Sequence, residues 1–365
     1  MPVPPNTAFV AAVDAWLVWL TANKGRAQAT AEKYRHYLIR LAAWAATPPE
    51  DPKRQPSTDD PWRLTAADIE LFAGLHAHAE GLTPRARRPL VSALRGFYTW
   101  ASGPGGHLAS NPAAQLPAPK VGRSLPRAAT LQHVERLLMA PDVSTMLGLR
   151  DAAIIATLAG CAPRISGLVR LNLRDLLWTE DQGRESLYLR LTEKGDHTRE
   201  VPAPQEVAML IRAYLAHPDR QALAAACVLP DGDQPLFVST SNRKVPAHEY
   251  YGEARRLASR GIRRMLKRYA RRARVPLEYA HPHALRHLYG AELAEDDADL
   301  VLRSALLGHA GPATTEIYSH LARRKLRRTV DRSNPLAKMR TPLLDTVRAI
   351  QSQTHPRPAA DGQNT

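Results

Sequence analysis

Four short segments hold side chains that together could attack a phosphodiester bond. The segments are AGCAPRISGL (159–168), EKGD (193–196), HPHALRHL (281–288) and GHAGPATTEIYSH (308–320), and the candidate residues are Arg164, Lys194, His283, Arg286, His309 and Tyr318. Two guanidiniums offer forked donors for phosphate oxygens. A tyrosine hydroxyl becomes a covalent nucleophile when a base and nearby positive charge help to remove its proton. Histidines can take that proton or donate to a phosphoryl oxygen, and a lysine can protonate the leaving alkoxide.

Each of these residues has a more ordinary explanation when it is taken alone. An arginine near a helix end is usually an ion-pair partner, and Tyr318 alone is more often a core residue. His283 and Arg286 lie three positions apart and share one helix face, which also suits a surface pair. It is the order of the whole set that indicates phosphodiester chemistry. The sequence has no GxxxxGK[ST] loop, no HExxH motif and no carboxylate cluster, so it predicts neither a cofactor nor a metal site.

The composition favours a polyanionic partner. The 365 residues carry 50 Lys and Arg against 35 Asp and Glu, a formal net charge of +15. Nucleic acid is the first candidate for such a charge and an anionic membrane the second. Asp14 interrupts the apolar stretch near the N-terminus and no basic segment precedes it, so neither a signal peptide nor a membrane span is expected. Two cysteines exclude a disulfide framework and indicate a reducing cytoplasm.

The first part of the chain predicts a small helical domain over residues 1–110. Helical periodicity runs through 7–46 and through about 84–101. Thr65 is a good N-cap for a helix that reaches His76, with Asp68 in the capping-box position. Five prolines and four glycines in 102–127 mark a domain boundary, and we expect a linker over 111–128.

A second domain over 129–335 is predicted to be mainly α with a small β-hairpin or sheet. Pro163 ends an expected helix over 148–161, because the residue before a proline avoids helical angles. Two short strands at 187–192 and 199–203 form the hairpin. Further helices are expected at 131–140, about 204–216, 261–274, 283–296, 298–307 and 312–325, and the tail from 355 is expected to be disordered.

The segment 254–274 is strongly basic. Ten of its 21 residues are Arg or Lys and none is acidic. One helical face is apolar, with Ile262, Met265, Leu266, Tyr269 and Ala273. A solvated charged face is the ordinary explanation of such a run. Like charges without compensation repel one another, however, so the sign imbalance favours a face that meets phosphates.

These motifs resemble the tyrosine site-specific recombinases, or phage-integrase family, and the likeness is Xer-like and extends from about residue 8 to 335. RDAAIIATLAGCAPRISGLVRLNLRDL is similar to the segment with the family's first catalytic arginine, and EKGDHTREVP to its G-K-G-x-K-x-R-x-V-P hairpin. HALRH and LLGHAGPATTEIYSH match its H-x-L-R-H and L-G-H, T-x-x-Y-x-H motifs. The resemblance implies Tyr318 as nucleophile and five further catalytic residues: Arg164, Lys194, His283, Arg286 and His309. The chain departs from the family's usual residues at Pro163, Gly167, Glu193 and His197.

The resemblance also implies a two-domain architecture that clamps double-stranded DNA at a specific site. A helical core-binding domain (1–110) and a mixed α/β catalytic domain (129–335) would hold the duplex, as a homo-tetramer or hetero-tetramer. The segment 336–365 would dock on a neighbouring protomer through apolar anchors, which are Leu336, Leu343, Leu344, Val347 and Ile350. The expected DNA contacts are Arg85, Arg87, Arg88, Lys120, Arg123, Arg260, Arg263, Arg264 and Lys267.

Two other functions stay open at this point. A type IB topoisomerase would share the catalytic set, and a DNA-binding protein without catalysis would share the basic helices. Within the recombinases, chromosome dimer resolution, phage integration and transposon or integron movement use the same chemistry.

Overall fold

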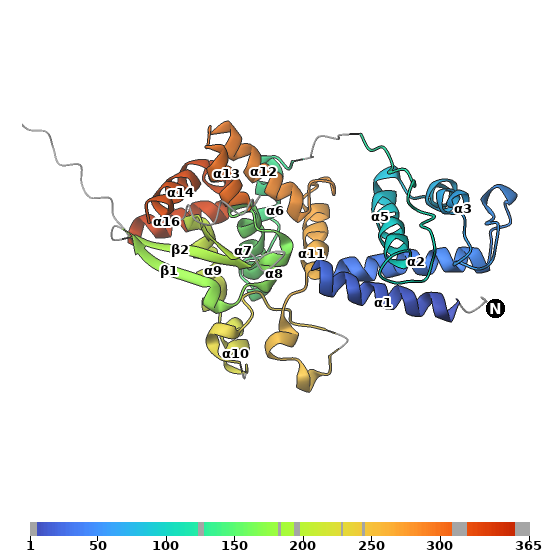
Figure 1. Ribbon diagram of the computed structural model, residues 1–365. Coiled ribbons are helices and arrows are strands. Elements are labelled where there is room, and N and C mark those ends of the chain that lie inside the picture. The colour runs from blue at the N-terminus through green and yellow to red at the C-terminus, as the bar shows by residue number, and fades with distance from the viewer. Residues whose placement is uncertain are drawn as a thin grey trace, which may run out of the picture. The chain divides into compact units, whose positions relative to one another are not determined.

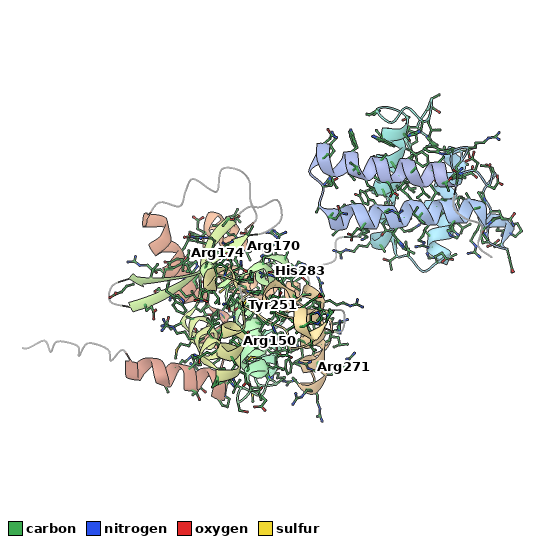
Figure 2. The ribbon with its side chains drawn as sticks, turned by 90° about the horizontal axis from the view of Figure 1, so that it is seen from below. Arg150, Arg170, Arg174, Tyr251, Arg271 and His283 are labelled. Atoms are coloured by element: carbon green, nitrogen blue, oxygen red, sulfur yellow. The ribbon has the colours of Figure 1, made fainter. Side chains whose placement is uncertain are left out.

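The computed structural model describes residues 6–122, 128–181, 184–192, 198–227, 229–242, 245–308 and 320–354; the side chains of 181, 184, 301, 320–325 and 350–354 lie outside this description. The chain divides into two compact units, Met1–Ser124 and Leu125–Thr365. Figure 1 shows the ribbon of each unit and Figure 2 adds the side chains. Each unit has its own hydrophobic core.

The N-terminal unit is helical. Its elements are α1 (Thr7–Lys24), α2 (Gln28–Ala46), a 3₁₀ turn (Pro52–Arg54), α3 (Ala66–Leu71), a π-helical turn (Phe72–His76), α4 (Ala77–Ala79) and α5 (Pro84–Ala101). The predicted helical stretches 7–46 and 84–101 are confirmed. The first is divided after Lys24, because Gly25 adopts a left-handed φ of 57° that ends α1.

Aromatic rings fill the core of this unit. The Phe9 and Phe97 ring centroids lie 5.2 Å apart in an edge-to-face arrangement, and Trp16 meets Phe97 at 5.7 Å. The hydroxyl of Tyr98, fully buried, donates to the Pro61 carbonyl over 3.1 Å. These contacts join α1 and α5 to the loop before α3.

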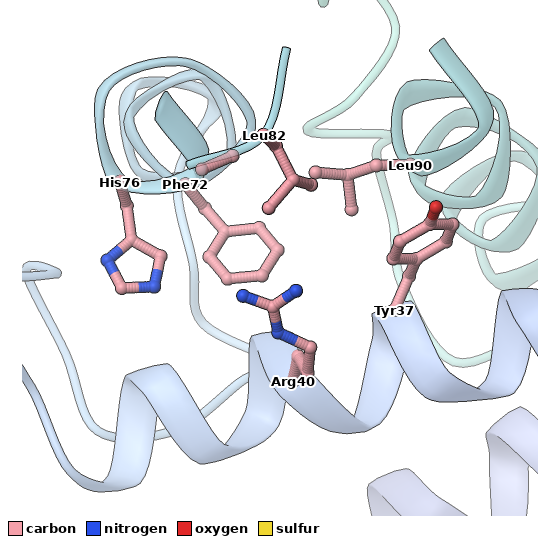
Figure 3. A pocket seen from close by; sticks show the side chains of 7 residues that line it. Tyr37, Arg40, Phe72, His76, Leu82 and Leu90 are labelled. Atoms are coloured by element: carbon pink, nitrogen blue, oxygen red, sulfur yellow. The ribbon is translucent and has the colours of Figure 1, made fainter. Parts of the chain in front are cut away.

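The capping box predicted at Thr65 is confirmed. The Thr65 hydroxyl accepts from the Asp68 amide, and the Asp68 carboxylate accepts from the Thr65 amide over 2.8 Å. Burial alone would raise the pKa of Asp68, but hydrogen bonds from Ser57 and Thr65 outweigh it and lower the pKa. The helix then passes into the π turn, where Phe72 stacks on His76 and the Arg40 side chain closes the recess beside them (Figure 3).

The first half of the expected linker packs on the N-terminal unit. Ala113 and Leu116 are buried in its core. The Arg95 guanidinium donates to the Leu116 carbonyl, and the Asn111 amide donates to the Thr99 hydroxyl over 3.0 Å. The division between the two units, after Ser124, falls inside the stretch 102–127 that the sequence marked as a boundary, while the first part of that stretch packs on the N-terminal unit.

The C-terminal unit is mainly helical with one small sheet, as the sequence predicted. Its elements are α6 (Leu131–Leu138), α7 (Met146–Gly160), α8 (Ile165–Arg170), β1 (Leu176–Asp181), β2 (Arg184–Thr192), β3 (Thr198–Pro202), α9 (Gln205–Ala216), α10 (Pro218–Ala225), α11 (Ser259–Arg272), α12 (Pro282–Glu295), α13 (Leu300–Leu307), α14 (His320–Ser333), α15 (Pro335–Lys338) and α16 (Pro342–Thr354). Short 3₁₀ turns occur at Leu173–Asp175, Asp231–Asp233, Ala247–Glu249 and Gly252–Arg255. The helix predicted over 312–325 falls largely outside the described residues.

The sheet is antiparallel in the order β1-β2-β3. Leu189 of β2 lies opposite Leu176 of β1 and Val201 of β3, and all three side chains are buried. The β2–β3 pair is the hairpin that the sequence predicted. β1 was not predicted, and it extends the hairpin into a three-stranded sheet.

Helix α7 lies at the centre of this unit. Its residues from Arg150 to Gly160 are all buried, and it packs against α9, α12 and α6. Among the described residues, no helix is long and apolar enough to cross a bilayer.

The C-terminal helices pack on their own unit. Leu336, Leu344 and Val347, three of the anchors identified in the sequence, join the core that contains α7. The Asn334 amide donates to the Glu206 carboxylate over 3.0 Å. Whether this segment exchanges onto a neighbouring protomer stays a prediction.

A buried carboxylate holds α11 to α7. Asp151, fully buried, accepts from Arg150 over 2.6 and 2.9 Å, from the Tyr269 hydroxyl over 2.9 Å and from Arg268 over 3.2 Å. Arg150 is itself buried and also donates to the Val238 carbonyl over 2.6 Å. A buried guanidinium without its carboxylate partner would be an uncompensated charge, which strongly destabilises the folded state.

Replacing Asp151 with Asn should lower the free energy of unfolding of the C-terminal unit by about 3 kcal/mol, because Arg150 then keeps a buried charge without its counter-ion. Denaturant unfolding followed by circular dichroism measures this. Asp345→Asn is the matched control. Asp345 is exposed, and its ion pair with Arg348 contributes less than about 1 kcal/mol to the free energy of unfolding. Equal losses in the two variants would contradict a structural role for the buried network.

Candidate active site

A tight turn after α7 places Arg164. The helix ends at Gly160, and Ala162 adopts a φ of 47° in the left-handed region. Pro163 accounts for the end of the right-handed helix, because a proline disfavours helical angles in the residue before it, but it favours extended backbone there and does not account for the left-handed φ of Ala162. Arg164 then becomes the N-cap of α8, and its guanidinium donates to the Gly308 carbonyl over 2.8 Å.

Helix α12 places Arg286. The helix begins at Pro282, and the His281 ring caps it by accepting from the Ala284 amide over 3.1 Å. Arg286, one turn later, is buried, with 8% of its surface exposed. Its guanidinium donates to the Ala162 carbonyl over 2.6 Å and to the Leu307 carbonyl.

The structure therefore brings Arg164 and Arg286 together. They donate to successive carbonyls at the C-terminal end of α13, and Arg286 also holds the turn from which Arg164 projects. The last carbonyls of a helix lack partners within it and carry partial negative charge. Their oxygens are acceptors of the kind that a phosphate would present to the same guanidiniums.

His283 lies on the exposed side of α12, three residues before Arg286. Partial burial lowers the pKa of its imidazole below the usual 6.5, and the positive charges of His281, Arg286, His287 and Arg263 lower it further. The neutral imidazole is therefore favoured at neutral pH. A neutral ring can accept a proton, which a general base requires.

The other three candidates lie outside the described residues. Lys194 falls between β2 and β3, whose ends are joined by the Thr192 and Thr198 hydroxyls 3.1 Å apart. His309 directly follows Gly308, and Tyr318 precedes the start of α14. In the described part of the chain, no three His, Cys, Asp or Glu side chains gather as metal ligands would.

Residues 128–325, more than half of the chain, match the Phage integrase family. The chain belongs to this family. A tyrosine recombinase XerD of Xanthomonas campestris pv. campestris is 33% identical over 336 residues, covering 89% of this chain and 92% of the relative. A tyrosine recombinase XerC of Alcanivorax borkumensis is 30% identical over 331 residues, covering 90% and 95%.

Solved structures of related architecture include integrases and recombinases on DNA. XerH bound to a palindromic difH substrate after cleavage gives a TM-score of 0.58 at 16% identity, covering 88% of this chain and 94% of that one. The Tn1549 transposon integrase with circular intermediate DNA gives 0.54 at 18% identity, covering 86% and 98%. At these identities the likeness shows the fold alone.

The basic residues expected to meet DNA differ in their surroundings. Arg260, Arg263, Arg264 and Lys267 are all exposed on α11, as is Arg271 beyond them (Figure 2). The opposite face of α11 is buried through Ile262, Met265, Leu266, Tyr269 and Ala270. The apolar stripe identified in the sequence is thus confirmed, with Ala273 at its margin.

In the N-terminal unit, Arg85, Arg88 and Lys120 are exposed. Arg87 turns inward instead and donates to the Gly74 carbonyl over 3.1 Å, which ties α5 to the π turn. Arg123 lies outside the described residues. Arg199 was not among the candidate residues, although it stands at the Arg position of the hairpin motif, and it donates to the Leu306 carbonyl over 2.6 Å. Its one signal is its place in the REVP stretch of the hairpin.

The imidazole of His283 should titrate below pH 6.5 in the protein without DNA, and Arg263→Gln should raise this pKa because one positive neighbour is lost. A reaction that needs neutral His283 would slow only as the pH falls through the lowered pKa. NMR titration of the ring resonances measures both values, with His283→Gln to assign the signal. Arg174→Gln serves as the control, since Arg174 is not among the charges that act on His283. A midpoint above 6.5 in the wild-type protein would contradict this environment.

Proposed function

We propose that this protein is a site-specific DNA recombinase that cleaves and rejoins DNA strands through a 3′-phosphotyrosyl intermediate on Tyr318. The observation that carries the proposal is the convergence of Arg164 and Arg286 on the end of α13, directly before His309 and the segment that contains Tyr318. Membership of the phage integrase family supports it.

The reaction needs no external energy source. The Tyr318 oxygen attacks the scissile phosphorus, a P–O bond to tyrosine forms, and the P–O bond to the 5′-oxygen breaks. The 5′-hydroxyl of a partner strand later attacks the phosphotyrosine and releases Tyr318. One bond is exchanged for a similar one at each step, so neither ATP nor a metal is required.

The proposed roles follow from charge and protonation. Arg164 and Arg286 stabilise the non-bridging oxygens of the transition state, and each guanidinium has five N–H donors to share between backbone and phosphate. His309 donates to the same group and Lys194 protonates the leaving 5′-oxygen. His283 helps to deprotonate Tyr318, a role that its lowered pKa supports. General acid–base help of this kind is worth roughly 10²–10⁴-fold per group.

Double-stranded DNA with a specific recombination site is the proposed partner, and a homo-tetramer or hetero-tetramer the proposed assembly in the cytoplasm. The charge of the chain and the exposed basic face of α11 support the DNA partner. The solved structures of XerH and of the Tn1549 integrase, both in complex with DNA, support it too. The core-binding domain and the catalytic domain would act as the two halves of a clamp that the linker joins. The C-terminal helices would be the segment that docks between protomers.

Tyr318→Phe should bind DNA as the wild-type protein does and form no covalent adduct, because the nucleophilic oxygen is absent. A nicked suicide substrate, from which the cleaved end diffuses away, traps the adduct of the wild-type protein for denaturing electrophoresis. Tyr251→Phe is the matched control, since Tyr251 is exposed on a loop of the C-terminal unit. An adduct in Tyr318→Phe would overturn the assignment, and relaxation of a plasmid without any specific site would favour a topoisomerase.

The double variant Arg264→Gln and Lys267→Gln should weaken DNA binding and flatten its salt dependence. Each lost phosphate contact lowers the slope of log affinity against log salt by about 0.9. Binding isotherms at several salt concentrations measure the slope. Arg212→Gln is the control, because Arg212 pairs with Glu185 and stacks 4.1 Å from the Trp178 ring. An unchanged slope in the double variant would remove this face of α11 from the DNA interface.

A further inference from the structure

We propose that Arg199 is a positioning residue for DNA cleavage: it holds the C-terminal end of α13, and with it the point where the chain enters the segment of His309. The inference rests on the proposed function for its kinetic consequence. Its structural part, the support of α13 by Arg199, can be measured without DNA.

Three guanidiniums meet three consecutive carbonyls at this helix end. Arg199 donates to Leu306 over 2.6 Å, Arg286 donates to Leu307, and Arg164 donates to Gly308 over 2.8 Å. The donors come from β3, α12 and the N-cap of α8, which are far apart in the sequence. Side chains from three separate elements thus fix one turn of backbone.

Helix α13 depends on such support because it is short. It has eight residues, and the last four carbonyls of any helix have no partner within it. A short helix gains little from its own hydrogen bonds, so its ends fray unless tertiary contacts hold them. Positive charge near the C-terminal end of a helix also stabilises it, because that end of the helix dipole is negative.

Arg199 reaches this position from inside the unit. Its side chain is only partly exposed, and it lies near Cys161 and Tyr289, which are fully buried. Burial raises the pKa of the Cys161 thiol to about 12, and the charge of Arg199 acts in the opposite direction. Arg199 therefore links β3 to α13 from a half-buried position, whereas Arg164 and Arg286 donate to the carbonyls nearer to His309.

A competing explanation is that Arg199 acts through the hairpin that holds Lys194. A change of leaving group distinguishes this explanation from the support of α13. In a substrate whose bridging 5′-oxygen is replaced by sulfur, the P–S bond breaks and the electron pair stays on sulfur as a thiolate. A thiolate leaves without a proton, because its conjugate acid has a pKa near 8.5. If a variant has lost acid catalysis by the lysine, the sulfur substrate therefore restores its rate of adduct formation. If it has lost the support of α13, the sulfur substrate does not restore the rate.

Arg199→Ala should slow adduct formation by about 100-fold, the size expected when reacting groups shift by about 1 Å. The slowing should be equal on the oxygen and sulfur substrates, and DNA affinity should stay within about threefold of wild type. Arg199→Lys should recover part of the rate, since an ammonium can still donate to Leu306. Arg190→Ala is the matched control, because Arg190 lies on the neighbouring strand and makes only a distant pair with Glu200 at 3.8 Å among its described contacts.

Hydrogen exchange gives a second readout in the protein without DNA. In Arg199→Ala, amides of α13 should exchange faster than in wild type, whereas amides of α7 should not change. Faster exchange throughout the unit would mean general unfolding, and Arg199→Lys would then supply the test. Two results would overturn the positioning role: adduct formation by Arg199→Ala at the wild-type rate, or full recovery of that rate on the sulfur substrate. An adduct in Tyr318→Phe would instead overturn the proposed function and leave the exchange result standing.

Discussion

The buried guanidinium of Arg286 is the constraint on which the candidate site depends. A charged group with 8% of its surface exposed is stable only if polar partners replace the water it has lost. Arg286 finds them in the carbonyls of Ala162 and Leu307. Those two residues belong to the turn before α8 and to the end of α13, so one side chain sets the distance between both. Arg164 follows directly after that turn, and the Gly308 carbonyl at the end of α13 accepts from its guanidinium.

This arrangement concentrates positive charge around α12. The groups that lower the pKa of His283, apart from burial, are all cationic. Such a cluster repels itself and opposes compactness until a polyanion arrives. The neighbouring core offsets the cost, because α7 is buried along most of its length and Asp151 neutralises Arg150 where α7 meets α11. The C-terminal unit thus pairs a buried apolar centre with an electropositive site at its margin.

The sequence predicted the features that depend on local chemistry. Helix α5, the capping box at Thr65 and the β2–β3 hairpin follow from spacing, capping and turn residues. Features that depend on a distant partner were not predicted. LLWTED becomes β1 because β2 is there to pair with it, and Arg87 turns inward because the Gly74 carbonyl lies within reach. For the candidate site, the motifs identified Arg164 and Arg286. Their convergence with Arg199 on the end of α13 depends on tertiary packing, which local patterns do not reveal.

Pro163 and Gly167, the departures near Arg164, have a common consequence. Pro163 keeps Ala162 out of right-handed helical angles, and the Ala162 carbonyl, in the turn after α7, accepts from Arg286. Gly167, three positions after Arg164 and buried in α8, has no carboxylate with which to hold the Arg164 guanidinium. The Gly308 carbonyl provides an acceptor from another element. The geometry of Arg164 is therefore tied to the end of α13, and any force that moves that end moves the Arg164 guanidinium with it.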